Sequence, residues 1–265
     1  MAAQRYACGV EYDGAEFAGW QVQAHARSVE QVIQQAVERV ADHEISLTVA
    51  GRTDAGVHAL GQIVHFDSTA RRSLRGWTFG INSALPSDVS LSFVRPVPGH
   101  FHARYSAQTR TYRYLIFNRR ERSAIAAARS SWQSRPLDLQ RMQRAALHLI
   151  GTHDFSAFRS AHCQSRSPIR RLESLTVMQR GPWIEITASA NAFLHHMVRN
   201  LAGLLIEIGQ RGDDPQRAAE VLVARDRRLN APTAAAQGLY LAEVRYPTAF
   251  ALPPIRYDVG ALAGR

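Results

Sequence analysis

The sequence predicts an α+β fold. Two observations support this prediction: segments that alternate apolar and polar residues, as half-buried strands do, are mixed with segments of helical periodicity, and the order of elements partly repeats in the second half. The chain has 265 residues, enough for one large or two small domains.

The first half reads strand, helix, strand, strand. Residues 5–12 have the strand pattern, and Ser28 with Gln31 forms a capping box at the start of a helix. That helix has one apolar stripe, formed by Val29, Val32, Ile33, Ala36, Val37 and Val40. Further strands are expected near residues 44–50 and 61–67, and again where Val89, Leu91 and Phe93 alternate with serines.

The second half opens with a strand at residues 110–118, followed by an exposed Arg- and Ala-rich connection at 119–136. A helix is marked by Leu139, Met142, Ala146 and Leu149, and a longer one by Phe193, Met197, Leu201, Leu204, Leu205 and Ile208. Between them, residues 171–179 and 183–190 read as paired strands about Gly181 and Pro182. A short helix after Asp214 and Pro215 and a strand at 239–246 complete the pattern.

These elements divide the chain into four predicted parts. Residues 1–105 form an N-terminal half, 106–136 a strand and connection, 137–248 a C-terminal half and 249–265 a tail. The tail from Pro253 onward contains Pro, Gly and Ala without periodicity, so we expect a surface tail or a packed arm.

The charge indicates a polyanionic partner. The formal net charge is +10 and the sequence pI is about 10.5, which is typical of nucleic-acid-binding proteins. The 32 basic residues are all Arg. They include clusters at Arg71, Arg72 and Arg75, at Arg119, Arg120 and Arg122, at Arg159, Arg166, Arg170 and Arg171, and at Arg225, Arg227 and Arg228. Charge clusters are often only solvated faces, and the sequence does not show which of them contact RNA.

The sequence also predicts where in the cell the protein is found and whether its cysteines form disulfides or bind metal. No stretch approaches the eighteen or so apolar residues of a membrane span, and the N-terminus lacks the pattern of a signal peptide. We therefore expect a cytoplasmic protein. The two cysteines, Cys8 and Cys163, lie far apart in sequence and suggest neither a disulfide framework nor a cysteine metal cluster.

The most informative segment is Ala-Gly-Arg-Thr-Asp-Ala-Gly-Val-His-Ala, residues 50–59. It places the carboxylate of Asp54 in a glycine-bracketed turn between two predicted strands, at the rim of a sheet. Arg52 could form an ion pair that keeps this carboxylate ionised and oriented. By pattern alone, an Asx turn with a solvated Arg52 is the commoner explanation.

Seven segments of this chain, in order, resemble the tRNA pseudouridine synthase A (TruA) family. They are Tyr12-Asp13-Gly14 with Phe17 and Gly19-Trp20-Gln21, the signature Gly-Arg-Thr-Asp-Ala-Gly-Val-His-Ala at residues 51–59, Phe101-His102-Ala103-Arg104, Arg110-Thr111-Tyr112-Arg113-Tyr114, His153-Asp154-Phe155 with Phe158, residues 191–200, and Gly238-Leu239-Tyr240-Leu241. The resemblance extends from about residue 5 to about residue 247.

The resemblance implies a fold, an activity and a partner. It implies the pseudouridine synthase fold, an α+β fold with two similar mixed α/β halves, antiparallel sheets flanked by helices, and an active-site cleft between the halves. The implied activity is that of an isomerase that converts uridine to pseudouridine at positions 38, 39 and 40 of the tRNA anticodon stem-loop. It also implies a homodimer that needs no cofactor and no catalytic metal.

The resemblance also implies roles for individual residues. Asp54 would be the nucleophile, attacking either C1′ of the ribose or C6 of the base, and Arg52 would orient it. Tyr112 would stack on the uracil and could take the C5 proton, while Leu239 would line the pocket. By pattern alone, Tyr112 and Leu239 would be core residues. Arg199 and His58 are further candidates for substrate binding, with a solvated helix position as the alternative for Arg199.

Two other functions remain open at this point. One is an RNA-binding or tRNA-folding protein with a vestigial pocket. The other is a metal hydrolase whose ligands would come from Asp54, Asp67 and the histidines at positions 58, 65, 100, 102, 195 and 196. The absence of an HExxH motif and of a cysteine pair argues against the hydrolase.

Overall fold

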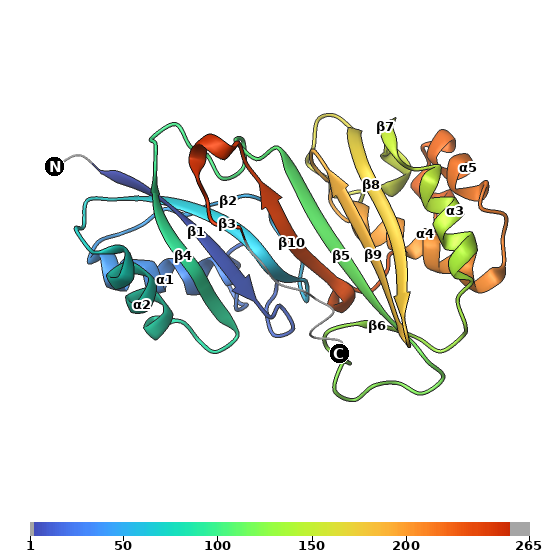
Figure 1. The fold of residues 1–265 in the computed structure, drawn as a ribbon, viewed down its shortest axis with the longest axis horizontal. Coiled ribbons are helices and arrows are strands. Elements are labelled where there is room, and N and C mark those ends of the chain that lie inside the picture. The colour runs from blue at the N-terminus through green and yellow to red at the C-terminus, as the bar shows by residue number, and fades with distance from the viewer. Residues whose placement is uncertain (1–2, 255–265) are drawn as a thin grey trace. The chain divides into compact units, whose positions relative to one another are not determined.

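The computed structural model describes residues 3–254 and divides into two compact units (Figure 1). Among the described residues, unit 1 contains 3–108 and 240–254, and unit 2 contains 109–239. The α+β class predicted from the sequence is confirmed in both units. The last strand crosses the boundary: Leu239 belongs to unit 2, whereas Tyr240 and the residues after it return to unit 1.

The sheet of unit 1 is mostly antiparallel. Its strand β1 (Gln4–Tyr12) pairs antiparallel with β3 (His58–Ser68) on one side and with β4 (Val89–Val97) on the other. Two further strands pair with β3 on its other edge. β10 (Leu239–Arg245) runs parallel to the first residues of β3, and the two-residue strand β2 (Thr48–Val49) pairs antiparallel with residues farther along β3. The strand predicted at 44–50 is therefore much shorter than expected.

Helix α1 (Val29–Ala41) confirms the helix predicted from the capping box. Ser28 caps it through its hydroxyl, which accepts a hydrogen bond from the Gln31 amide at 3.4 Å. The predicted apolar stripe is only partly buried: Val29, Ile33, Ala36 and Val37 are buried, as is Ala41. Figure 1 shows α1 crossing one face of the unit 1 sheet.

A second helix of unit 1, α2 (Leu74–Ala84), was not predicted from the sequence. The Ser73 hydroxyl caps it by accepting a hydrogen bond from the Gly76 amide at 3.0 Å. Two glycines weaken its intrinsic helix propensity, and only Trp77 and Ile81 are buried. The helix is therefore stabilised chiefly by the packing of these two side chains.

Alternation along the strands produces a core on each face of the unit 1 sheet. On the helical face, the rings of Tyr6, Phe66 and Trp77 pack together with centroids 5.3–5.6 Å apart. On the other face, Phe101 packs with Ala7, Ile63, Phe93, Val97 and, from the C-terminal segment, Tyr246 and Phe250. Of the predicted tail, Phe250 and Leu252 thus pack against unit 1, while residues 255–265 lie outside the described part of the chain.

Unit 2 contains an antiparallel sheet in the order β5 (Thr109–Asn118), β9 (Trp183–Ala190), β8 (Ile169–Arg180) and β7 (Gly151–Asp154). The predicted hairpin about Gly181 is confirmed as β8 and β9. Within the predicted connection, a short strand β6 (Ser131–Gln133) pairs parallel to β5.

Three helices complete unit 2: α3 (Leu139–Leu147), α4 (Met197–Arg211) and α5 (Arg217–Ala224). Helix α4 begins four residues later than its first apolar residue suggested, because His196 has a left-handed backbone with φ of 65°. Figure 1 shows α3 beside α4. None of the helices in the described range 3–254 is long and apolar enough to cross a membrane.

Candidate active site

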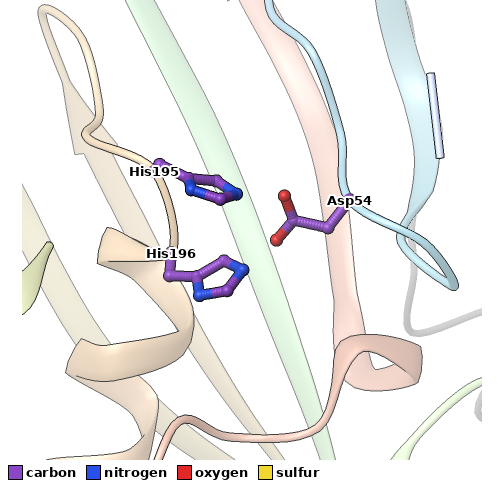
Figure 2. Close-up of side chains that lie close together, drawn as sticks. All are labelled: Asp54, His195 and His196. Carbon is purple, nitrogen blue, oxygen red and sulfur yellow. The ribbon is translucent and has the colours of Figure 1, made fainter. Parts of the chain in front are cut away.

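The Asp54 turn, residues 50–57, connects β2 to β3 in unit 1. The Ala50 amide donates a hydrogen bond to the Ile63 carbonyl at 2.8 Å, which fixes the turn's first residue to the sheet. At the other end, the Val57 amide donates to the Asp54 carbonyl at 3.2 Å, and Gly56 has φ of 75°. Figure 2 shows the Asp54 side chain extending from this turn, and the residue is half-buried. The predicted placement of this carboxylate in a turn between two strands is confirmed.

The supporting segment, residues 12–20, holds the Asp54 turn from the side. The Trp20 amide donates to the Thr53 carbonyl at 3.0 Å, and the Gly56 amide donates to the Phe17 carbonyl at 3.3 Å. The Tyr12 hydroxyl lies 2.7 Å from Thr53 Oγ1. Backbone contacts on both sides of Asp54 therefore limit where its carboxylate can go.

Two glycines of the supporting segment allow its close approach to the turn. A Cβ atom on Gly14 would overlap the Val57 carbonyl. Gly19 has φ of 106°, and a Cβ there would lie 3.0 Å from the Thr53 carbonyl oxygen. Because both neighbours are backbone atoms, neither can move away without moving the turn.

Buried polar groups complete the support from within unit 1. Gln62 is fully buried, and its Nε2 donates to the Gly51 carbonyl at 2.7 Å. Burial raises the pKa of Tyr12 to about 12, although hydrogen bonds from Thr53 and Gln62 act in the opposite direction. The Tyr12 hydroxyl therefore stays protonated and remains a neutral hydrogen-bonding group at physiological pH.

His58, the first residue of β3, is enclosed in unit 1 with 2 % of its surface exposed. Its Nδ1 lies 3.0 Å from both the Gly14 amide nitrogen and Asp13 Oδ1, and its ring stacks on Tyr240 with centroids 4.7 Å apart. A neutral ring accepts from Gly14, and a protonated ring donates to Asp13. In either form, His58 ties the supporting segment to β3, so its burial favours an indirect role over direct contact with substrate.

Arg52 is exposed, unlike its neighbours in the turn. Within residues 3–254 it does not form the predicted ion pair with Asp54. The guanidinium instead extends from a turn whose backbone is already fixed by Thr53 and Gly51. Backbone hydrogen bonds thus fix the path of the turn that carries Asp54, and the sequence pattern alone did not identify them.

In unit 2, Tyr112 lies on β5 opposite Ala188 of β9. It is 8 % exposed, and the Phe193 ring meets it edge to face with centroids 5.1 Å apart. The next residue on the same face, Tyr114, is fully buried and donates through its hydroxyl to the Ala235 carbonyl at 2.9 Å. Tyr112 is therefore a packed aromatic residue with a small exposed fraction.

Arg199 and Leu239 are connected through the segment that precedes Leu239. Arg199 Nε donates to the Ala234 carbonyl at 2.8 Å, and the Ala234 amide donates to the Arg199 carbonyl at 3.2 Å. Gly238 allows the chain to pass close to the Leu115 carbonyl and the Tyr114 ring. Leu239, which follows, is 6 % exposed. Arg199 therefore fixes the path of the chain toward Leu239.

The two adjacent histidines lie immediately before α4, as Figure 2 shows. Their ring centroids are 4.1 Å apart, His195 is exposed, and its carbonyl accepts a hydrogen bond from the Ser160 amide at 2.9 Å. Among the described residues, neither unit by itself brings together three His, Cys, Asp or Glu side chains as a cation site requires.

The predicted Arg clusters differ in exposure. Arg71, Arg72 and Arg75 are exposed, as are Arg119, Arg120 and Arg122. In the last cluster, by contrast, Arg227 donates to Asn200 Oδ1 at 3.1 Å and to Thr233 Oγ1 at 3.0 Å, and burial lowers its pKa. Arg227 is therefore a structural residue of unit 2 and not a free phosphate ligand.

Comparison with known proteins gives a consistent answer across most of the chain. A family model described as tRNA pseudouridine synthase matches residues 9–106 and 145–247. The tRNA pseudouridine synthase A of Alcanivorax borkumensis is 48% identical over 250 residues, which is 94% of each chain. That of Salmonella typhimurium is 48% identical over 252 residues, or 95% of this chain and 93% of the relative. Together with the Asp54 turn and its support, these matches show that the chain belongs to the tRNA pseudouridine synthase A family.

Proposed function

We propose that this protein isomerises uridine to pseudouridine in tRNA, at positions 38, 39 and 40 of the anticodon stem-loop. Its relatives named tRNA pseudouridine synthase A match nearly its whole length. The observation that carries the proposal is the Asp54 turn, whose carboxylate is half-buried and whose backbone is fixed by the supporting segment. A positioned carboxylate is what a covalent route through an aspartate requires.

The reaction needs no net addition or removal of atoms. The bond between N1 of uracil and C1′ of ribose breaks, the uracil rotates, and C5 is joined to C1′ while the C5 proton moves to N1 or to solvent. Asp54 attacks either C1′ or C6 to start this sequence. In either route the uridine must leave its base stack before the carboxylate can reach it.

Tyr112 and Leu239 are the proposed contacts to the uracil from unit 2. Each has only a small exposed fraction, so each offers an apolar surface with a fixed position. Tyr112 would stack on the base and could accept the C5 proton, and Leu239 would exclude water. Arg199 would act by holding the segment before Leu239, to which it is hydrogen bonded. Exposed Arg52 would orient Asp54 or the flipped nucleotide once tRNA is bound.

His58 is proposed to position the Asp54 turn and not to touch the uridine. Its contacts with Asp13 and Gly14 lie inside unit 1, directly behind the turn. The expected result for His58→Leu is a lower kcat with tRNA affinity unchanged, and His58→Asn, which keeps an acceptor for the Gly14 amide, should restore part of the rate. Equal losses in kcat and affinity would favour direct substrate contact.

The proposed partner is tRNA, bound by a homodimer in the cytoplasm. The net charge of +10 and the exposed Arg clusters fit a phosphate backbone. If about six phosphates are neutralised, affinity should fall roughly a thousandfold between 50 and 200 mM salt. Measuring the molar mass by light scattering tests the dimer, and a monomer at assay concentration would contradict it.

The decisive experiment measures pseudouridine in unmodified tRNA transcripts after incubation with wild type or Asp54→Asn, with EDTA present. The expected result is product from wild type alone, with both proteins binding tRNA equally, because the substitution removes the nucleophile but keeps the shape of the side chain. Asp42→Asn is the matched control: Asp42 is exposed, and Asn tolerates its left-handed backbone. Binding without product from wild type would indicate an RNA-binding protein, and inhibition by EDTA would indicate a metal enzyme.

A further inference from the structure

The connection between β4 and β5 contains a second organised loop in unit 1, which the proposed chemistry does not use. We call residues 101–105, Phe-His-Ala-Arg-Tyr, the aromatic loop. Phe101 and Ala103 are fully buried, whereas Tyr105 is 76% exposed. Buried residues thus anchor a loop that presents a large aromatic ring to solvent.

Hydrogen bonds within the aromatic loop fix its conformation. His102 Nδ1 accepts from the amides of both Arg104 and Tyr105, each at 3.2 Å. The Ser106 hydroxyl accepts from the His102 amide at 3.0 Å, and the Ser106 amide donates to the His102 carbonyl at 2.9 Å. Burial and the nearby guanidiniums of Arg5 and Arg104 lower the pKa of His102, which keeps Nδ1 available as an acceptor.

The aromatic loop is also fastened to the rest of unit 1. Arg5 Nη1 donates to the carbonyls of Gly99 at 2.7 Å and Phe101 at 2.8 Å. The Tyr246 hydroxyl donates to the Ala103 carbonyl at 2.6 Å. The exposed ring therefore sits on a preorganised base, so a ligand that stacks on it would lose little entropy in ordering the loop.

Tyr105 has the surroundings of a stacking surface. Its ring lies against His102 with centroids 4.3 Å apart and an interplanar angle of 35°. The Arg104 guanidinium carbon lies 5.6 Å from the Tyr105 ring centroid. An exposed aromatic ring beside a guanidinium is the combination on which unpaired bases stack.

The local charge favours a polyanion over a protein surface as the partner. The chain has no Asp or Glu from residue 89 to residue 120, while Arg95 and Arg104 lie in this stretch and are exposed. Asp67 pairs with Arg5 at 2.7 Å, and the same guanidinium donates to the carbonyls of Gly99 and Phe101.

We propose that Tyr105 and Arg104 form a stacking platform for an unpaired tRNA base, separate from the Asp54 turn. The base stacks on the tyrosine ring, and the guanidinium contacts the adjoining phosphate or stacks beside it. The proposal rests on the proposed function, because it takes tRNA as the ligand. It adds a binding contribution to substrate recognition and takes no part in the isomerisation.

Affinity for an unmodified tRNA transcript tests the platform directly. Tyr105→Ala should raise Kd roughly 5- to 150-fold, the range of one lost base–aromatic stack, while Tyr105→Trp should bind within about twofold of wild type. The slope of log affinity against log salt should not change in Tyr105→Ala and should fall by about one in Arg104→Ala. At saturating tRNA, Tyr105→Ala should turn over at the wild-type rate.

Phe79 offers a matched control on the same unit. It is 66% exposed on α2, and the Arg75 guanidinium lies 5.2 Å from its ring centroid, but it is not part of the aromatic loop. Phe79→Ala should leave tRNA affinity unchanged. An equal loss of affinity in Phe79→Ala, wild-type affinity in Tyr105→Ala, or a change of molar mass in Tyr105→Ala would each overturn the proposal, the last by assigning Tyr105 to a contact between protein chains.

The same preparations separate this proposal from the proposed function. If wild type binds tRNA but forms no pseudouridine, while Tyr105→Ala loses affinity, the isomerase proposal fails and the platform stands. If wild type forms pseudouridine and Tyr105→Ala binds as well as wild type does, the platform alone fails. Circular dichroism of each variant confirms that the loss is not one of folding.

Discussion

The Tyr12 hydroxyl lies 2.7 Å from Thr53 Oγ1, one residue before Asp54. Both residues are buried, with 2 % of Tyr12 and 8 % of Thr53 exposed. Tyr12 ends β1, so this hydrogen bond transmits the position of a central strand to the Asp54 turn. The rigidity of the proposed nucleophile therefore depends on a residue more than forty positions away in sequence.

Replacing Tyr12 with Phe should lower both stability and turnover. The change removes a buried hydrogen bond and leaves the Thr53 hydroxyl without this partner, which should decrease the free energy of unfolding by roughly 1–2 kcal/mol. The kcat should fall while tRNA affinity stays the same. Urea unfolding and steady-state kinetics measure the two effects. Tyr6→Phe, at a buried position of the same strand, is the control, and an equal loss of kcat there would contradict a specific role for Tyr12.

Adding a single methyl group to Gly14 should displace the Asp54 turn. The Cβ of Gly14→Ala would overlap the Val57 carbonyl, so either the supporting segment or the turn has to move. We expect a loss of about 1–3 kcal/mol in the free energy of unfolding and a severe loss of kcat. Gly99→Ala is the matched control, because a Cβ at Gly99 meets no atom within 4 Å. Retained kcat in Gly14→Ala would show that the turn tolerates this shift.

Regular elements with strong periodicity could be predicted from the sequence. The capping box at Ser28 and the apolar stripe located α1, and the turn residue Gly181 located the hairpin of β8 and β9. These signals are local, since a cap and a turn depend on residues within a few positions. Helix α2 was missed because it contains two glycines and buries only Trp77 and Ile81. Its sequence therefore shows little helical periodicity, and the helix depends on packing against neighbouring strands.

The sequence predicted the key residue of the candidate site, Asp54, but not the residues that hold its turn in place. The glycine-bracketed turn correctly placed Asp54 between two strands, β2 and β3. The hydrogen bonds from Trp20 and Tyr12 join distant parts of the chain, and no periodicity reveals such pairs. The family resemblance did mark Tyr12, Gly14 and Trp20, without indicating that they contact the turn. The expected Arg52–Asp54 ion pair does not form within the described residues, where backbone hydrogen bonds hold the turn.

The two cysteines should react very differently with a thiol reagent. Cys8 is fully buried on β1, and burial raises the pKa of its thiol, whereas Cys163 is partly exposed in a loop of unit 2. Because the thiolate is the reactive form, native protein should release about one equivalent of chromophore from Ellman's reagent, and denatured protein about two. Cys163→Ala should abolish the native reaction. A remaining fast reaction in that variant would show that β1 opens readily.

Acid should destabilise the protein partly through His65. Burial, followed by the charges of Arg5 and His102, lowers the pKa of His65 from 6.5 to about 4. Between these values the unfolded chain takes up a proton that the folded protein does not, so stability falls as pH decreases from 6.5 toward 4. The loss should be steepest at about 1.4 kcal/mol per pH unit and reach up to about 3 kcal/mol.

The variant His65→Asn isolates this contribution. The Asn side-chain oxygen can replace Nδ1 as the acceptor of the Ala103 amide, which His65 holds at 3.1 Å, but it does not titrate. Carboxylates that do not interact with His65 contribute equally to both proteins, so the difference between their urea unfolding free energies reports His65 together with its coupling to Asp67 and His102. That difference should change with pH between 6.5 and 4, with the variant losing less stability than wild type. Parallel curves would show that His65 keeps its ordinary pKa in the folded protein and that acid acts through other groups.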